Sequence, residues 1–170
     1  MNILKRQRIH KRNAIEYIND CIKVYTSSGE SFLIDRQDEW VLNDYRWFIS
    51  KGYVMAAATT DKGKTTIRLH RLILSPPYWL HVDHISMDTT DNRRANLRVC
   101  TSAENKRNST MPRTNTTGYK GIFRSGNSWR ARIKVNYIPI NLGSYRTKED
   151  AYAAYCAAAL IYHGEFARVD

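Results

Sequence analysis

The stretch from residue 118 to the C-terminus constrains the fold more than any other part of the chain. Three short runs, 119–124, 128–135 and 138–145, are separated by the turn-forming pairs Gly126-Asn127 and Asn136-Tyr137. In the alanine-rich segment that follows, apolar side chains recur at helical spacing: Ala151, Ala154, Tyr155, Ala158 and Ile161 or Tyr162. These patterns predict three strands followed by one helix, a small α+β unit.

Local signals delimit this helix and divide the faces of the sheet. Thr147 and Asp150 form a capping-box-like pair, and Gly164 ends the helix. In the second run, neighbouring side chains point to opposite faces. One face carries Trp129, Ala131 and Ile133, and the other carries Arg130, Arg132 and Lys134. The apolar face suits the helix. The basic face suits a polyanion, although an ordinary solvated surface remains the alternative.

The first hundred residues read as a second, strand-rich unit. Two hairpins are expected: 21–25 with 31–34 around Gly29, and 52–58 with 65–69 around Asp61-Lys62-Gly63. Residues 38–49 predict a short helix that runs into a strand, and a helix is also expected at Ala14–Ile18. We therefore expect an α+β protein in parts: a basic arm (1–19), a domain (20–108), a polar linker (109–117) and a C-terminal domain (118–170).

Charge and composition narrow the classes of function. The chain has 170 residues and a net charge of +11, which is concentrated at its two ends. Residues 1–19 contribute +4 and residues 109–170 contribute +5. This distribution favours a polyanion as partner, with solubility alone as the alternative. No apolar run is long enough for a membrane helix, and the basic N-terminus lacks the apolar core of a secretory signal. Three separated cysteines argue against a disulfide framework and favour a reducing, cytoplasmic location.

Residues 82–105 hold the side chains that suggest chemistry. Asp83 and His84 place an oxygen ligand beside a proton acceptor. Asn96 follows His84 by 12 positions, and Asn105 follows Asp83 by 22. Thr101 and Glu104 form a capping box, so a helix should start near residue 102 and carry Asn105. Oxygen ligands of this kind suit Mg²⁺ and not structural zinc. Each feature alone is weak, but the combination is specific.

The pattern VDHI…DNRRANLRV…AEN resembles the HNH endonucleases, in particular the phage and intron-homing branch in which Asn is the third motif residue. The resemblance covers residues 69–108 and implies a ββα-metal fold around one divalent cation, Mg²⁺ or Mn²⁺. By the same resemblance, Asp83 and Asn105 are metal ligands, His84 is the general base and Asn96 holds the loop that orients it. His70 and Arg71 lie in the segment that precedes the motif and are candidate site contacts.

The C-terminal stretch resembles the APETALA2-type DNA-binding domain over about 50 residues. The resemblance rests on YKGI, W.ARI, LG.Y.T.EDA and HGEFA, and it implies that the sheet enters the major groove of DNA. DNA contacts would then fall on Lys120, Arg124, Arg130, Arg132, Lys134 and Tyr145. Phe123 stands where that family typically has Arg, so base specificity does not transfer.

Together these features predict a metal-dependent endonuclease that hydrolyses double-stranded DNA. The resemblance implies a site-specific enzyme of the homing type, encoded by a phage or intron and active inside the host cell. Because the sequence has one catalytic set and no apolar stretch that marks a dimer interface, we expect a monomer that nicks one strand first, with no membrane partner. Two alternatives stay open: a DNA-binding regulator whose nuclease centre has lapsed, and an RNA-binding protein. The intact set of Asp83, His84, Asn96 and Asn105 argues against the first. The lack of an aromatic RNA-binding platform argues against the second.

Overall fold

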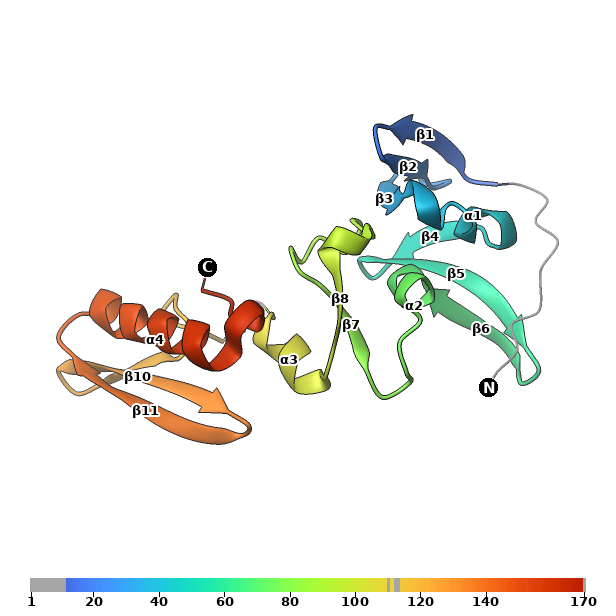
Figure 1. Ribbon diagram of the computed structural model, residues 1–170. Coiled ribbons are helices and arrows are strands. Elements are labelled where there is room, and N and C mark those ends of the chain that lie inside the picture. The colour runs from blue at the N-terminus through green and yellow to red at the C-terminus, as the bar shows by residue number, and fades with distance from the viewer. Residues whose placement is uncertain (1–11, 110, 112–113, 170) are drawn as a thin grey trace. The chain divides into compact units, whose positions relative to one another are not determined.

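The computed structural model describes residues 12–109, 111 and 114–169. Residues 1–11 of the expected basic arm therefore lie outside the described residues, as do 110 and 112–113 of the expected linker. The contacts divide the chain into two compact units, one ending at Thr101 and one beginning at Ser102. Both contain small antiparallel sheets and short helices, so the mixed α+β class is confirmed (Figure 1).

The first sheet of the N-terminal unit has the order β1-β2-β3. Its buried side chains alternate along the two inner strands, at Ile22, Val24, Phe32 and Ile34. Gly29 adopts a positive φ in the β2–β3 turn, as the hairpin pattern predicts. The strands are β1 (Ala14–Ile18), β2 (Cys21–Tyr25) and β3 (Ser31–Asp35), and they lead into the turn η1 (Arg36–Asp38) and helix α1 (Val41–Asp44).

The helix expected at Ala14–Ile18 is wrong, because these residues form strand β1. All five are exposed, so no buried helical face selects a helix here. The segment instead satisfies its backbone by antiparallel pairing with β2, in a register that runs from Ala14↔Tyr25 to Ile18↔Cys21. Ile15, Tyr17 and Ile18 also belong to residue types that favour strands.

The second sheet has the order β4-β5-β6 and supplies much of the core. Its hairpin turns at residues 61–62, as predicted, and the next segment forms a short helix that packs against it. Ser75 ends this helix in the left-handed conformation, directly before Pro76 and Pro77. The elements are β4 (Trp47–Ser50), β5 (Tyr53–Thr60), β6 (Gly63–Arg68) and α2 (Leu69–Leu74). One core joins both sheets, with Trp47, Leu69, Val82 and Leu97 among its members.

A two-stranded hairpin completes the N-terminal unit. Strand β7 (His81–His84) pairs with β8 (Leu97–Cys100), and the connection between them includes the turn η2 (Arg94–Asn96). This connection is tied to β3 by main-chain hydrogen bonds at Leu33, and to η1 by an ion pair of 2.8 Å between Arg94 and the fully buried Asp38. The loop that follows His84 is therefore held in place by residues from distant parts of the chain.

The C-terminal unit begins with α3 (Ser102–Arg107), at the start predicted by the capping box. Its sheet has β10 in the centre, and α4 packs on the apolar face through Ala151, Ala158 and Ala159. Thr147 caps α4 by accepting a hydrogen bond from the Asp150 amide, and Gly164 ends it, both as predicted. The strands are β9 (Ile122–Ser125), β10 (Ser128–Val135) and β11 (Ile138–Tyr145), and α4 (Lys148–His163) leads into η3 (Gly164–Phe166).

Two details of this unit differ from the sequence-based expectation. Ile161 and Tyr162 are exposed, because the core under α4 ends at Ala158 and Ala159. Residues 119–121 precede β9 and do not belong to a strand. Gly121 has a positive φ there, and a Cβ at this position would overlap the Tyr155 ring, so the close packing of α4 requires glycine.

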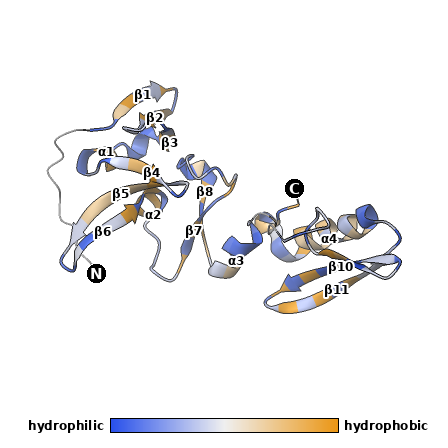
Figure 2. Ribbon diagram, turned by 180° about the vertical axis from the view of Figure 1, so that it is seen from behind, coloured by the Kyte–Doolittle hydropathy of each residue, from blue (hydrophilic) through white to orange (hydrophobic). Residues whose placement is uncertain are grey.

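Hydropathy follows this architecture. Figure 2 shows hydrophobic residues along β5 and β10, whereas α3 is largely hydrophilic. No helix within the described ranges is long and apolar enough to cross a membrane.

Candidate active site

Asp83 and His84 are the last two residues of β7, and both side chains are buried. In the hairpin they pair with Arg98 and Leu97 of β8. The structure gives the two side chains different neighbours: Asp83 contacts Arg98, and His84 contacts Asn92 and His70. Adjacent positions at the end of one strand thus present a carboxylate and an imidazole within one small region of the N-terminal unit.

The imidazole of His84 lies in a pocket of rings and amides. Its Nε2 is 3.4 Å from Oδ1 of Asn92, and its ring stands edge-on to that of His70, with 4.9 Å between the ring centroids. Tyr53 completes the group at 6.4 Å. Burial lowers the pKa of His84, and the Asn92 hydrogen bond and the Asp83 charge oppose that shift. The imidazole is therefore neutral at pH 7, which is the form that accepts a proton.

Asn96 fastens the loop between the two strands of the hairpin. Its Oδ1 accepts a hydrogen bond from the Ser86 amide at 2.8 Å, and its Nδ2 donates to the carbonyl oxygens of Asp91 at 2.8 Å and Asp88 at 3.3 Å. The main chain adds a bond from the Ile85 amide to the Asn96 carbonyl. Three side-chain bonds to the residues that follow His84 restrict the backbone on which that imidazole sits.

Asn92 is a site residue that the sequence analysis did not assign. It is fully buried, its Nδ2 donates to the carbonyls of Thr89 and Thr90, and its Oδ1 faces His84. Its own amide donates to the Leu33 carbonyl of β3. In the sequence it reads as an ordinary turn residue, and the available signal was a second asparagine four positions before Asn96.

The Asp83 carboxylate is held by a guanidinium. Nε and Nη2 of Arg98 both donate to Oδ2 of Asp83, at 3.0 and 2.9 Å, and both side chains are largely shielded from solvent. Arg98 was not singled out in the sequence, because its partner depends on the β7–β8 register. The Arg98 guanidinium thus holds the Asp83 carboxylate in position at the end of β7.

His70 and Arg71 both lie on α2, and their surroundings differ. His70 is buried beside His84 and Tyr53, and its Nδ1 has no hydrogen-bond partner among the described residues. Arg71 donates from Nη1 to the Leu80 carbonyl at 2.7 Å, which ties α2 to the chain that enters β7. Helix α2 thus positions one side chain against the candidate base and anchors the approach to the hairpin with the other.

Asn105 lies on α3, in the C-terminal unit, and is half-buried. This helix is fastened within its own unit: Lys120 donates from Nζ to the carbonyls of Arg107 and Ser109, and Arg107 donates to Asn136. A cation at the C-terminal carbonyls of a helix is favourable. The Lys120 ammonium therefore has a structural partner in addition to the DNA contact expected from the sequence.

The other basic residues singled out in the C-terminal domain line the sheet. Arg130, Arg132 and Lys134 are exposed along β10, whereas Ala131 and Ile133 between them are buried, so the two faces are as predicted. The side chain of Arg124 lies over the Trp129 ring, and the Tyr145 hydroxyl donates to the Leu142 carbonyl at 2.8 Å. Three cations thus face solvent, and Tyr145 packs partly against the core.

His70 makes stability depend on pH. Burial, and then the nearby His84 and Arg68, lower its pKa from 6.5 to about 3. Between these two pH values the unfolded chain binds a proton at His70 that the folded chain does not. The contribution of the neutral His70 to the free energy of unfolding is therefore complete above pH 6.5 and is lost as the pH falls toward about 3. We expect His70→Gln to lose less unfolding free energy than the wild type between pH 6.5 and 4, measured by urea titration.

The matched control for that measurement is His81→Gln, which replaces an exposed histidine of β7. Its stability should follow the wild-type dependence on pH. If His70→Gln and the wild type lose stability in parallel over this range, the buried state of His70 is not the cause.

Comparison with known proteins assigns the segment around this site. Residues 76–107 match the family model for HNH endonucleases. A relative from Acanthamoeba polyphaga mimivirus, named an uncharacterized HNH endonuclease, is 29% identical, and the alignment covers 89% of this chain and 82% of the relative. No solved structure matches the chain. The matched residues include both strands of the hairpin and α3, so the similarity to HNH endonucleases falls on the segment that carries Asp83, His84, Asn96 and Asn105.

Proposed function

We propose that this chain is a metal-dependent endonuclease that hydrolyses phosphodiester bonds in double-stranded DNA. One observation carries the proposal: the buried, neutral imidazole of His84 lies at the end of β7, in the β7–β8 hairpin, within the segment that matches HNH endonucleases. A neutral histidine is the form that can abstract a proton from water.

In this proposal His84 accepts the proton of the attacking water. Asn92 and His70 fix the plane of the ring, and Asn96 holds the loop behind it. Because the imidazole is already oriented and desolvated, little reorganisation is needed when the proton moves. General base catalysis of this kind is worth roughly 10²- to 10⁴-fold in rate.

A divalent cation fits the donor chemistry of the remaining candidates. Asp83 offers carboxylate oxygens, Asn105 offers an amide oxygen, and hard cations such as Mg²⁺ or Mn²⁺ take oxygen ligands. No group of three His, Cys, Asp or Glu side chains suited to a metal occurs in the described part of the chain, so water and phosphate oxygens would complete the shell. Bound there, the cation would neutralise the scissile phosphate and stabilise the leaving 3′ oxygen.

The C-terminal unit is proposed to grip duplex DNA through the exposed cations of β10. Arg130→Ala should lower the slope of log affinity against log salt by about 0.9, the amount expected for one phosphate contact. The requirement for metal should not change, because Arg130 is not one of the proposed metal ligands. Filter binding of a duplex over a range of salt concentrations measures the slope.

Lys62→Ala is the control for charge alone, because it removes one exposed cation from the β5–β6 turn of the other unit. Equal slope changes in Arg130→Ala and Lys62→Ala would mean that net charge, and not the β10 face, governs binding.

Two experiments separate this proposal from its alternatives. A lapsed regulator binds duplex DNA and leaves supercoiled plasmid intact in Mg²⁺, whereas the proposed enzyme converts it to nicked circles before any linear product. Nicking first is expected of a monomer with one catalytic set. An RNA-binding protein would prefer RNA over duplex DNA of the same sequence in a competition experiment. Linear DNA formed without a nicked intermediate would overturn the nicking assignment.

A further inference from the structure

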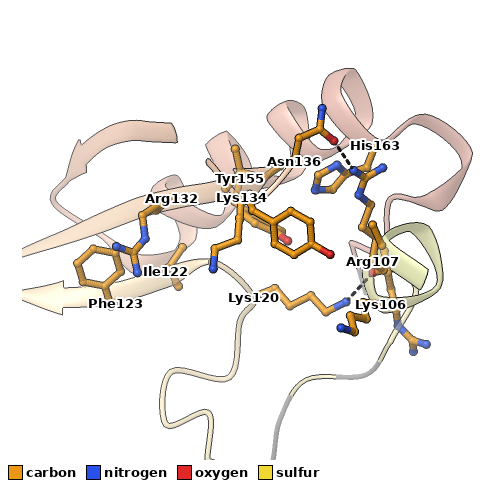
Figure 3. A pocket seen from close by; sticks show the side chains of 15 residues that line it. Lys106, Arg107, Lys120, Ile122, Phe123, Arg132, Lys134, Asn136, Tyr155 and His163 are labelled. Atoms are coloured by element: carbon orange, nitrogen blue, oxygen red, sulfur yellow. Dashed lines mark hydrogen bonds between the residues drawn. The ribbon is translucent and has the colours of Figure 1, made fainter. Parts of the chain in front are cut away.

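The C-terminal unit contains an open cavity of about 600 Å³, which shares Arg132 and Lys134 with the proposed duplex-binding face but is otherwise lined by residues outside that face. Figure 3 shows its residues arriving from α3, from the chain before β9, from β10 and from the end of α4. Its volume lies in the range of cavities that hold small organic ligands. The cavity is therefore large enough for a discrete group, in contrast to a flat surface that a duplex could lie against.

The charge of the cavity is of one sign. Six basic side chains take part in its lining: Lys106, Arg107, Lys120, Arg132, Lys134 and Arg168. Among the described residues that line it there is no Asp or Glu. Because a concave surface of one sign focuses the electrostatic potential, the cavity attracts an anion.

The remaining wall is apolar and aromatic. Ile122, Ile133 and Tyr155 take part in this lining, and the Phe123 ring lies 5.2 Å from the Arg132 guanidinium. A purely phosphate-binding cavity would not need this surface. A ligand that carries a flat apolar group together with a negative charge would use both parts of the wall.

Tyr137 supplies an exposed ring at this cavity. It is 75% exposed and has a φ of 68°, a left-handed conformation that is uncommon for a bulky residue. Asn136 before it also has a positive φ, so the β10–β11 turn carries an aromatic side chain where asparagine or glycine is usual. Backbone strain of this kind often occurs where a side chain has a function.

Two of the six cations hold the frame of the cavity. Lys120 bonds the carbonyls of Arg107 and Ser109, and Arg107 bonds Asn136 in the turn that carries Tyr137 (Figure 3). Lys106 on α3 and Lys134 on β10 are exposed. Hydrogen bonds of Lys120 and Arg107 thus hold the residues around the cavity in place, and the ammonium groups of Lys106 and Lys134 are exposed.

We propose that this cavity binds one unpaired nucleotide of a DNA strand. The base stacks on the exposed Tyr137 ring, and Lys134 and Lys106 contact the phosphate. A base inside a duplex could not reach such a wall, whereas an unpaired one exposes its flat face. The proposal rests on the proposed function, because it takes DNA as the substrate. It also places a strand along α3, the helix that carries Asn105.

The test compares single-stranded and duplex DNA on the full chain. In fluorescence anisotropy with a short labelled oligothymidylate, Tyr137→Ala should weaken binding roughly tenfold, the size expected for one lost base–aromatic stack. Its affinity for intact duplex should change less than about twofold, because stacked bases do not enter the cavity. Lys134→Ala should weaken oligothymidylate binding and lower its salt slope by about 0.7.

Matched controls make the result specific. Tyr162→Ala removes another exposed tyrosine of the same unit, outside the cavity, and should bind oligothymidylate as the wild type does. Arg130→Ala removes a β10 cation that does not line the cavity, and should weaken duplex more than oligothymidylate.

Three outcomes would overturn the proposal: wild-type oligothymidylate binding by Tyr137→Ala, equal losses for single strand and duplex, or tighter binding of the matching oligouridylate. Failure here is distinguishable from failure of the proposed function. If the wild type nicks plasmid and Tyr137→Ala binds oligothymidylate normally, only the proposed nucleotide cavity is refuted. If oligothymidylate binding requires Tyr137 but the wild type never cuts DNA, only the proposed nuclease activity is refuted.

Discussion

Replacing His84 with alanine should slow DNA cleavage by roughly 10²- to 10⁴-fold while DNA binding survives. The buried, neutral imidazole is the proposed proton acceptor, and alanine removes it without adding bulk. Its loss leaves the exposed cations of β10 untouched, which is why affinity should persist. Single-turnover cleavage of a labelled duplex at saturating protein measures the rate, and anisotropy on the same duplex measures binding.

His81→Ala is the matched control, because it removes an exposed histidine from the first position of the same strand. It should cleave at the wild-type rate. Thermal unfolding of both variants separates a catalytic loss from a folding loss. Cleavage by His84→Ala at the wild-type rate would remove this residue from the mechanism.

Replacing Asn105 with alanine should abolish cleavage at metal concentrations that saturate the wild type. The half-buried amide is one of two oxygen donors proposed for the cation, and α3 is fastened by Lys120 and Arg107, not by Asn105. The fold of the C-terminal unit should therefore survive the change. Cleavage is measured against Mg²⁺ and Mn²⁺ concentration, with circular dichroism as the check on folding.

Asp83→Ala should give the same loss of cleavage for the same reason, with an added cost in stability. It leaves the Arg98 guanidinium without its carboxylate in a shielded position, which typically costs about 3–5 kcal/mol. Asn105→Ala is thus the cleaner variant. Its control is Asn127→Ala, an exposed amide in the β9–β10 turn. Cleavage by Asn105→Ala that equals that of Asn127→Ala would exclude Asn105 as a ligand.

Local patterns were sufficient to predict most of the elements. The alternation in 128–135 and 138–145 matches β10 and β11, and the Thr147 and Gly164 signals bracket α4. The sequence pattern did not predict β1, because all residues of this edge strand are exposed and apolar residues therefore need not alternate with polar ones along it. Its conformation depends on pairing with β2, which is a tertiary contact.

The candidate site divides in the same way between local and long-range information. Asp83 and His84 are adjacent in sequence, and their residue types alone indicate a carboxylate beside a base. Asn92 and Arg98 could not be found in that way. Asn92 faces His84 only because its loop is attached to Leu33, and Arg98 meets Asp83 only through the hairpin register. Tyr53 joins the group from a different sheet.

The boundary between the units shows the limit of composition as a guide. Residues 109–117 read as a linker because they are polar and lack periodicity. By contacts, however, the second unit begins at Ser102 and includes α3. The bonds of Lys120 and Arg107 that hold this helix join residues 13 and 29 positions apart, so no local pattern reveals them. The proposed metal ligand Asn105 therefore belongs structurally to the C-terminal unit.

Plasmid nicking after complete chelation tests the central claim most directly. The full chain is treated with EDTA, transferred to metal-free buffer and mixed with supercoiled plasmid, and Mg²⁺ is then added in steps. We predict no cleavage before Mg²⁺ is added, nicked circles from the wild type afterwards, and plasmid that stays largely intact with His84→Ala over the time in which the wild type nicks it completely. Nicking by the chelated chain, or equal nicking by the wild type and His84→Ala, would contradict a metal-dependent nuclease centred on this histidine.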